Sequence, residues 1–498
     1  MKTKNLLPVV LLFCLFMLLS YSAFANNIII SNVLLTEQVS GSHTMVQFDI
    51  SWENSWRNDI AGTGYTEPYN YDAAWVFVKY KGVSGEWQHA WLNTTNGNHT
   101  APSGSEIKIG VTNISGTYRG IGAFFQRSEN ETGNFSKTGV QLRWEYIANG
   151  VLDGATVDIQ VFAIEMVYVP LGSFTVGDGV SANTFCKAND VTSPYETFTI
   201  GATAPTLAGN HSSSSPSRLS ARGNWDLIPG ATANLATGFP TGYDDFYCMK
   251  YEIMQQQYVD FLNSLTTTQA SNRYSSGNPG GRYGITVTSG VYSNTTTQYV
   301  ACNYLSWADL AAYLDWSGLR PMTELEFEKS CRGTGPAVQN ECACGAIDAT
   351  KATGILNGGF YNETASNSGA NVCYDYGITS GPMRVGAFAT ATSTRVTSGA
   401  TYYGIMEMSG NLEERTVTVG NSTGRAFTGT HGNGLLDPAT GDADITYWPG
   451  IDAIGTGYRG GDWLYYYSYL CVSDRYGGAD AYAVRKDNFG GRGVRTAP

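Results

Sequence analysis

Residues 26–165 carry a repeated alternation of apolar and polar positions. From Val46 to Trp52 every second residue is apolar, and clusters of Gly, Asn, Ser and Thr separate this segment from others of the same kind. Side chains alternate between the two faces of a strand, so each such segment indicates a half-buried β-strand. The strand candidates are residues 28–35, 46–52, 75–79, 120–127, 140–146 and 156–164. Six or more short strands without a helical period predict a β-sandwich.

The remainder, residues 166–498, mixes short strands with helices and long polar loops. Ser306 precedes Asp309 by three positions, and Thr323 precedes Glu326 by the same spacing. Each pair can form a capping box at the start of a helix, and an apolar helical face follows both. No Pro- or Ser-rich linker separates a strand at 161–164 from one at 166–169. We therefore expect two domains held at a fixed angle.

The first 25 residues have the pattern of a secretory signal. Lys2 and Lys4 supply the positive start, residues 6–19 the apolar stretch, and Ala23 and Ala25 a small-residue cleavage site. An N-terminal membrane anchor is the alternative, but the apolar stretch is short for a span of about 20 residues. We expect cleavage after Ala25, no membrane span in the mature chain, and a secreted, periplasmic or cell-surface location.

Composition narrows the possible partners. The net charge is −12, and only 14% of the 498 residues are charged, whereas Gly (59) and Tyr (32) are abundant. Nucleic acids and anionic membranes bind clustered Lys and Arg, so neither is an expected partner. Eight of the nine cysteines follow residue 25, which permits disulfides without fixing their pairing. Cys342 and Cys344 lack a second pair at zinc-site spacing, which favours a structural role.

Six motifs in the C-terminal part occur in the order found in one enzyme family. They are a strand motif at 166–177, aromatic segments at 251–261 and 305–309, an Arg-Pro motif at 319–333, a Gly-Asn motif at 404–414, and Gly-Gly and Gly-Arg-Gly motifs within 459–495. This stretch resembles the formylglycine-generating enzymes, or sulfatase-modifying factors. The resemblance implies a loop-rich, C-type-lectin-like fold. The expected fold class is α+β, with an all-β sandwich at 26–165 followed by this domain at 166–498.

The same resemblance implies that the family's chemistry is missing. In the family, two cysteines five residues apart follow the Gly-Gly pair and hold copper; here those positions are Tyr465 and Leu470. Copper(I) needs soft ligands, and neither side chain provides one. Cys471 lies one position further on but has no cysteine near position 465. The iron-dependent branch of this fold needs three histidines, and this part holds only His211 and His431. We assign no catalytic residue and expect no copper.

A calcium site is implied by the Gly-Asn motif. The family binds calcium through an early side chain, two backbone carbonyls and a late Glu. These positions correspond to Glu407, Gly410, Leu412 and Glu414. Carboxylate and carbonyl oxygens are the ligands that Ca²⁺ prefers, so calcium is the expected cofactor. A structural loop with solvated carboxylates is the alternative.

The C-terminal tail, residues 464–489, is rich in Tyr, Ser, Asp, Gly and Ala between fixed landmarks. Tyr and Ser are typical of adaptable binding surfaces, because Tyr provides a large contact area at low entropic cost. The tail resembles the variable region of target proteins of diversity-generating retroelements, and a fixed tail packed over the site is the alternative. The candidate ligand-binding residues are Asp462, Trp463, Tyr465, Tyr466, Tyr467, Tyr469, Tyr476 and Tyr482.

These observations favour an exported, non-catalytic protein that binds a protein, peptide or glycan through its Tyr-rich C-terminal surface. Two alternatives stay open. One is a copper-dependent oxidase that generates formylglycine in sulfatases. The other is a structural surface protein whose C-terminal domain stabilises an assembly.

Overall fold

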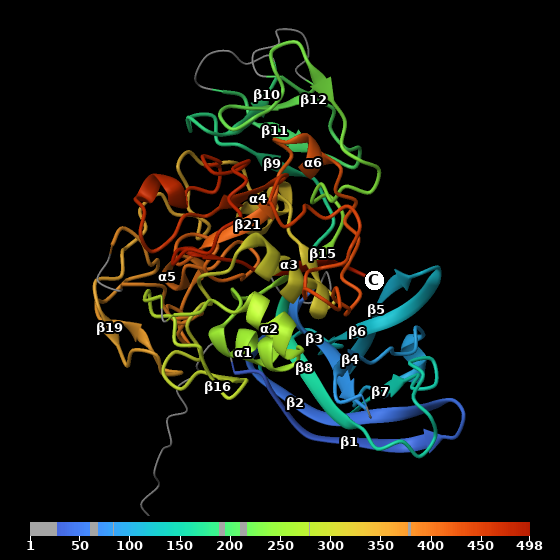
Figure 1. Cartoon of the computed structure of the whole chain (residues 1–498). Helices are drawn as coiled ribbons and strands as arrows, with labels where there is room; N and C mark the ends of the chain where they lie inside the picture. Colours follow the sequence, from blue (N-terminus) through green and yellow to red (C-terminus); the bar gives the residue numbers. More distant parts are fainter. Residues whose placement is uncertain are drawn as a thin grey trace, which may run out of the picture.

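The computed structural model describes residues 27–59, 68–82, 84–188, 195–209, 217–277, 279–376 and 380–498. The expected signal sequence and His211 lie outside these residues. The described chain is rich in β-strands that form several antiparallel sheets, with short helices between them (Figure 1). Among the described helices, none is both long and apolar enough to cross a membrane.

The N-terminal part consists of two groups of antiparallel strands. Its strands are β1 (Ile29–Val39), β2 (His43–Asn58), β3 (Asn70–Lys81), β4 (Trp87–His89), β5 (Ser105–Ile114), β6 (Thr117–Arg127), β7 (Glu131–Trp144) and β8 (Asp158–Val169), with a 3-10 turn at Asn96–Asn98. Strand β2 pairs with β1 and β7, whereas β3 pairs with β4, β6 and β8. Among the described residues, only two residue pairs join β2 to β3.

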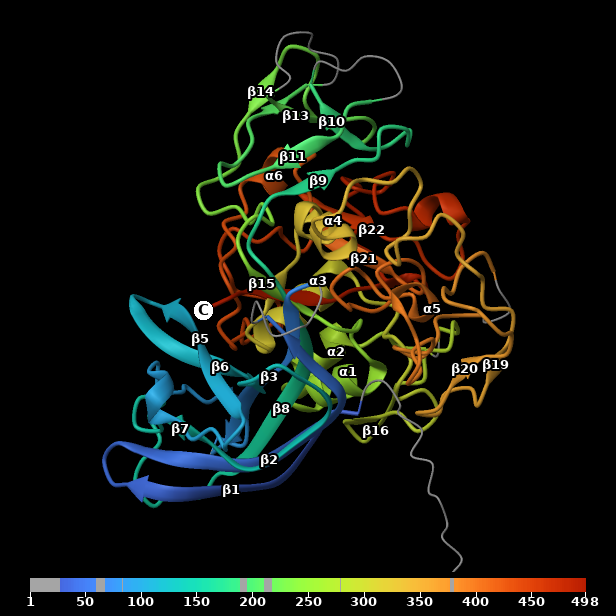
Figure 2. The same ribbon diagram turned by 180° about the vertical axis from the view of Figure 1, so that it is seen from behind.

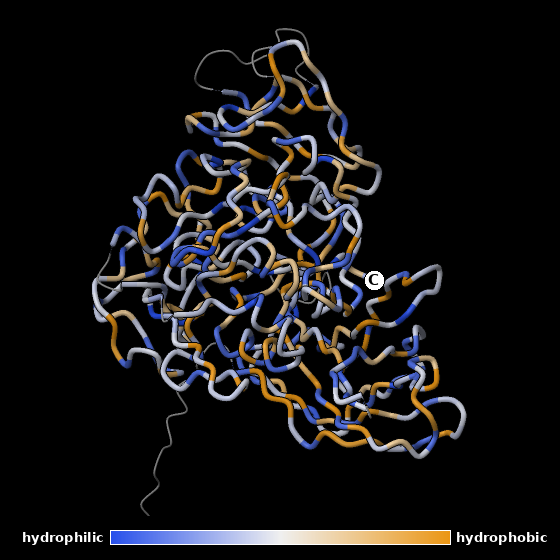
Figure 3. The backbone as a smooth tube through the Cα atoms, in the orientation of Figure 1, coloured by the Kyte–Doolittle hydropathy of each residue, from blue (hydrophilic) through white to orange (hydrophobic). Residues whose placement is uncertain are grey.

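The two strand groups bury one shared apolar cluster. Alternate residues of β2, such as Val46 and Phe48, face Val76 and Val78 of β3 in it. Hydrophobic and hydrophilic residues alternate along these long strands (Figure 3). Each of the six strand candidates coincides with part of an observed strand. Strand β5 was missed, although Ile107, Ile109 and Val111 follow the same period of two.

Strand β8 connects the two parts of the molecule. Its residues 158–167 pair with β3, and its residues 166–169 pair with β15 (Phe246–Met249). Strand β24 (Gly493–Thr496) and then β18 (Arg320–Pro321) continue this sheet. One sheet therefore extends from the N-terminal strands into the C-terminal part, without a linker between them.

Short helices lie in the C-terminal part. They are α1 (Gln255–Asn263), α2 (Thr267–Arg273), α3 (Trp307–Trp316), α4 (Glu324–Arg332), α5 (Arg395–Ser398) and α6 (Ser422–Arg425), with a 3-10 turn η2 at Tyr467–Leu470. Both predicted capping boxes are confirmed. Ser306 accepts a hydrogen bond from the backbone N–H of Asp309, and Thr323 from that of Glu326.

Small sheets complete the C-terminal part. They are β9 (Phe174–Val176) with β11 (Phe198–Ile200); β10 (Phe185–Lys187), β13 (Leu219–Ala221), β12 (Leu207–Ala208) and β14 (Thr232–Ala233); β16 (Thr286–Thr288) with β17 (Val291–Ser293); β19 (Ile355–Leu356) with β20 (Thr364–Ala365); and β22 (Thr456–Arg459), β21 (Glu413–Val417) and β23 (Phe489–Gly490). The sheet of β10 and β12–β14 lies at the end of the molecule opposite β1 and β2 (Figures 1 and 2).

The junction between the N-terminal strands and the helices is part of the largest apolar core. Trp75 of β3 is fully buried there, and its indole N–H donates to the carbonyl of Ser317 at 2.8 Å. The guanidinium of Arg495 lies 4.7 Å from the Trp75 ring centroid. A buried aromatic side chain contributes several kcal/mol to stability, so this contact holds the two parts together.

Candidate ligand-binding site

The Tyr-rich segment begins at a turn that requires two glycines. Gly460 and Gly461 follow β22 with φ values of 92° and 65°. A Cβ at Gly461 would lie 2.9 Å from the backbone of Tyr469, so the chain can close on itself only with glycine there. The Asp462 carboxylate then accepts the backbone N–H groups of Leu464 and Tyr465 at 2.7 and 2.9 Å. Together these features fix the direction in which the tyrosines leave the sheet.

Buried ion pairs anchor both sides of the segment. Arg459 donates to Glu328 at 2.7 Å, and Arg475 donates to both carboxylate oxygens of Glu324 at 2.9 Å. All four side chains are fully shielded from solvent, and both glutamates belong to α4. Removing one partner of such a pair leaves an uncompensated buried charge. The tyrosines between these anchors therefore sit on a rigid base.

Three tyrosines form a contiguous group on the surface. Tyr465 and Tyr476 expose 38% and 54% of their area, and Tyr469 lies half-buried between them. Ring centroids are 5.2 Å apart for Tyr465 and Tyr469, and 5.6 Å apart for Tyr469 and Tyr476. The C-terminal segment that carries them, red in Figure 1, runs across the C-terminal part beside β21.

These rings surround a pocket of about 180 Å³. We call it the tyrosine pocket, and its lining residues are Glu413, Tyr458, Arg459, Gly460, Gly461, Tyr465, Tyr469, Asp474, Tyr476 and Gly477. Strands β21 and β22 supply its floor through Glu413 and Tyr458. The Tyr458 hydroxyl donates to Asp480 at 3.0 Å, which holds that ring in place.

The floor of the tyrosine pocket is acidic. Glu413 is only 3% exposed, and no described residue donates a hydrogen bond to its carboxylate. Burial raises the pKa of Glu413 well above its ordinary value, and the nearby carboxylates of Asp462 and Asp474 raise it further. Burial also raises the pKa of Asp474 to about 6. The charge of Arg459 is already paired with α4, so the pocket presents its carboxyl groups to a ligand.

The structure places the other predicted ligand residues outside the lining of this pocket. Asp462 and Trp463 are buried, and the Trp463 indole donates to the carbonyl of Asp487 at 3.1 Å. Tyr466 is 64% exposed but does not line the pocket. The Tyr467 hydroxyl donates to the Asn340 carbonyl at 3.1 Å, and Tyr482 packs against Phe489. Sequence reasoning missed Glu413, Tyr458 and Asp474. The sequence held one indication of Glu413, because the formylglycine-generating enzymes that this part resembles have Trp at that position.

The two positions that the resemblance assigns to copper ligands have different environments. Tyr465 is on the surface, whereas Leu470 is fully buried beneath it. Cys471 is also buried, and burial raises the pKa of its thiol to about 12. A thiol held protonated at neutral pH is a poor nucleophile and a poor metal ligand.

The loop expected to bind calcium is buried behind this surface. Glu407 accepts the backbone N–H of Gly386 at 2.8 Å, and Glu414 accepts a hydrogen bond from Arg492 at 2.6 Å. Each carboxylate keeps one buried oxygen, Oε2, without a hydrogen-bond partner. Two unsatisfied hard oxygens fit a calcium ion, although Arg492 already supplies positive charge at Glu414. Within the described ranges, no three Asp, Glu, His or Cys side chains are grouped closely enough to hold a metal.

The other two predicted calcium ligands contribute backbone only. The Gly410 N–H donates to the carbonyl of Gly460 at 2.8 Å, and the Leu412 N–H donates to Glu252 at 3.0 Å. Glu252 is therefore a further buried carboxylate beside this loop, and burial raises its pKa well above its ordinary value. Gly410 takes φ 79°, and a Cβ there would lie 2.5 Å from the carbonyl oxygen of Cys373.

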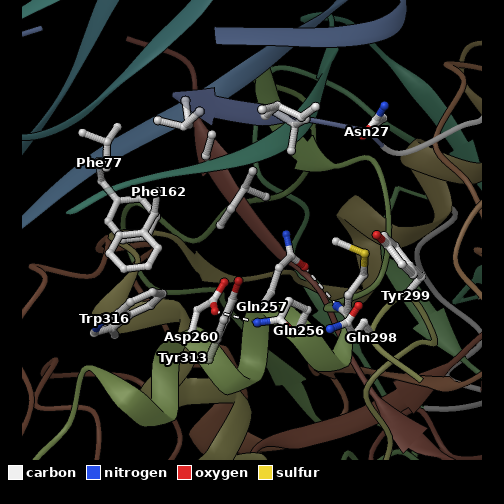
Figure 4. A pocket seen from close by; sticks show the side chains of 17 residues that line it. Asn27, Phe77, Phe162, Gln256, Gln257, Asp260, Gln298, Tyr299, Tyr313 and Trp316 are labelled. Carbon is white, nitrogen blue, oxygen red and sulfur yellow. Dashed lines mark hydrogen bonds between the residues drawn. The ribbon is translucent and has the colours of Figure 1, made fainter. Parts of the chain in front are cut away.

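A larger cavity of about 470 Å³ lies where β1 and β8 face α1. Figure 4 shows the rings of Phe77, Phe162 and Trp316 together at one end. Towards the middle, Asp260 accepts a hydrogen bond from Gln256 at 2.8 Å. Its carboxylate therefore has a partner from its own helix, unlike the carboxylate of Glu413. We accordingly regard the tyrosine pocket as the candidate site.

Comparisons with known proteins add little to this geometry. No family model matches the chain, and no curated protein does. Among solved structures, Treponema denticola variable protein 1 is similar at 14% sequence identity and a TM-score of 0.27. The similarity covers 64% of this chain and 100% of that chain. A TM-score this low does not establish a shared fold, so function is argued from the site itself.

Proposed function

We propose that this chain is an exported, non-catalytic binding protein whose ligand contacts the tyrosine pocket. The ligand would be a protein, a peptide or a glycan. The proposal includes a β-sandwich at 26–165 and a formylglycine-generating-enzyme-like, C-type-lectin-like domain at 166–498. The observation that carries it is the group of Tyr465, Tyr469 and Tyr476 around an acidic floor.

The tyrosines favour binding over a purely structural role. Exposed aromatic side chains on a rigid base lose little conformational freedom when a ligand covers them. Tyr465 and Tyr476 keep large exposed areas in the folded chain. A structural surface protein needs no such concave group of rings, so that alternative has no specific observation in its favour.

The oxidase alternative lacks its reactive groups. It requires two thiolates at the positions where Tyr465 and Leu470 stand. Cys471 is buried with a raised pKa, and neither it nor Cys342, its partner in an isolated β-bridge, lines this pocket. The lining residues can contact and orient a ligand, but they include no group able to carry out the oxygen-dependent oxidation.

The proposal also gives calcium a supporting role. Glu407 and Glu414, through their unpartnered Oε2 atoms, would hold the ion together with the carbonyl oxygens of Gly410 and Leu412. A bound cation would neutralise buried carboxylates behind the Tyr-rich segment and stabilise the loop that supports it.

A binding screen with a matched control tests the proposal. Wild-type protein is applied to a glycan array and to a displayed peptide library, in parallel with a variant carrying Tyr465→Ser, Tyr469→Ser and Tyr476→Ser. The control variant carries Tyr118→Ser, Tyr361→Ser and Tyr447→Ser, which removes three exposed tyrosines outside the pocket.

The pocket variant should lose capture at least 30-fold, because aromatic anchors of an interface each contribute about 2 kcal/mol or more. The control should bind like the wild type. Both variants should melt within a few degrees of the wild type, because surface substitutions change stability by about 0.5 kcal/mol each. Equal capture by the pocket variant would contradict the proposed function. A collapse of its melting temperature would show that the tyrosines belong to the core.

A further inference from the structure

The size of the tyrosine pocket restricts what enters it. At about 180 Å³ it is smaller than the roughly 300–1,000 Å³ of pockets that enclose whole small molecules. It therefore suits a single side chain of a larger ligand, with the rest of that ligand lying over the exposed rings of Tyr466 and Tyr476.

The side chains that line the tyrosine pocket favour a positively charged ligand group. Its walls are the faces and edges of Tyr465, Tyr469 and Tyr476, and such rings attract cations through their quadrupoles. Its floor holds the carboxyl groups of Glu413 and Asp474. Glu413 is more than nine-tenths buried and lines the pocket without a hydrogen-bond donor among the described residues. An acidic floor beneath aromatic walls is the arrangement that binds ammonium and guanidinium groups.

The only cation in the lining is Arg459, and it does not satisfy Glu413. Its guanidinium donates to Glu328 at 2.7 Å and to the carbonyls of Val472 and Asp474 at 2.7 and 2.8 Å. Those bonds direct the guanidinium towards α4 and the backbone. The carboxyl group of Glu413 lines the pocket and accepts no hydrogen bond from Arg459, so it is open to a hydrogen-bond donor from a ligand.

We infer that the tyrosine pocket binds the side chain of a lysine or arginine on a protein or peptide ligand. The aliphatic part of that side chain packs between Tyr465, Tyr469 and Tyr476, and its charged end donates to Glu413 and Asp474. This inference rests on the proposed function and specifies its ligand as a basic peptide segment.

Three small probes test the inference directly. They are the Nα-acetyl methylamides of lysine, arginine and norleucine, measured by saturation-transfer NMR against the full-length mature protein. Norleucine has the apolar stem of lysine without its charge. We expect the lysine and arginine probes to bind and the norleucine probe to bind at least tenfold more weakly. Norleucine binding as tightly as lysine would overturn the inference.

Substitutions in the tyrosine pocket test whether the lysine probe binds there. Glu413→Gln keeps the shape of the side chain but cannot become a carboxylate, and it should weaken the lysine probe at least tenfold. Tyr465→Ser, on the surface, should also weaken it and does not threaten the fold. Asp260→Asn is the matched control, because it neutralises a carboxyl group in the other cavity, and it should leave binding unchanged. Unchanged lysine binding in both Glu413→Gln and Tyr465→Ser would overturn the inference.

The two proposals fail separately. If the tyrosine triple variant loses array capture but no cationic probe binds the wild type, only the lysine or arginine inference is overturned. If the ligands captured by the arrays are uncharged glycans, that inference is overturned as well. If the wild type captures nothing that depends on the three tyrosines, the proposed function fails.

Discussion

At the scale of single residues, burial rather than identity determines what each side chain of the tail can do. Tyr465 and Leu470 are five positions apart, yet one is exposed and the other has no exposed area. Glu413 lies in a β-strand and is almost completely covered, but the small part that remains faces the tyrosine pocket. A conservative substitution of Glu413 should therefore change ligand binding, whereas one of Leu470 should change the packing of the core.

Residue identity at positions 465 and 470 predicts that the protein does not generate formylglycine. Incubation with copper, oxygen and a Cys-x-Pro-x-Arg peptide should yield no aldehyde, because no pair of thiolates lies at the pocket to hold copper(I). Mass spectrometry of the peptide checks this outcome. A conversion that disappears in Cys471→Ser would contradict it, and a sulfatase-derived peptide with Ser in place of Cys is the blank.

At the scale of elements, the loop before β21 supports the floor of the pocket. Residues 407–414 place two carboxylates with unpartnered oxygens directly before and within the strand that carries Glu413. Burial raises the pKa of Glu407 to about 7, so without a cation this group is partly protonated at neutral pH. Calcium and protons therefore compete for the same oxygen.

We expect calcium to raise the melting temperature of the protein, and EGTA to reverse the effect. Binding to the folded state alone adds roughly 2.7 kcal/mol at a hundredfold excess over Kd. The increase should be larger at pH 8 than at pH 6, because Glu407 has lost its proton at the higher pH. Thermal melts at both pH values measure it.

Glu407→Gln tests whether Glu407 is a ligand of the calcium ion. It should remove the calcium effect, whereas Glu129→Gln, at an exposed position, should retain it. Identical melts of the wild type with calcium and with EGTA would show that the loop is structural, with Glu407 held neutral by its proton.

At the scale of the whole molecule, burial shifts the pKa values of several titratable groups towards neutral pH or beyond it. Burial raises the pKa of Asp315 to about 8 and of Glu407 to about 7, and raises those of Glu252 and Glu413 well above their ordinary values. Between about pH 6.5 and pH 8 the folded protein holds protons that the unfolded chain has released. The free energy of unfolding should therefore fall as pH rises through this range. Other groups oppose the trend, because burial lowers the pKa values of Lys79, Lys329, His89 and His431. The hydrogen bond with Cys342 likewise lowers the pKa of Cys344 to about 7.

We expect a higher melting temperature at pH 6.5 than at pH 8, measured in EGTA, because the raised pKa values of the four carboxyl groups outweigh the lowered pKa values of the opposing groups. Asp315→Asn should reduce the difference, since it removes one titrating group at the junction. Asp348→Asn, at an exposed position, should leave the difference unchanged. A melting temperature that rises with pH in the wild type would contradict this prediction.

The sequence by itself determined the local structure. The alternation of apolar and polar residues predicted six strands correctly. A strand with one face packed against the core has an apolar residue at every second position, and the sequence shows this pattern directly. Both capping boxes formed where Ser306 and Thr323 predicted them, because a cap needs only residues three positions apart. The absence of cysteine at positions 465 and 470 is likewise a property of the sequence alone.

Only the tertiary structure decided which residues form the site. It brings Glu413 and Asp474, which are distant in sequence, to one floor, and it selects Tyr465, Tyr469 and Tyr476 from a longer run of tyrosines. Asp462 and Trp463 are adjacent to that run and yet are buried. No local pattern carries this information, because exposure depends on how β21, β22 and α4 pack around the Tyr-rich segment. The pairing of β8 with both β3 and β15 is equally long-range, and it fixes the two parts of the molecule against each other.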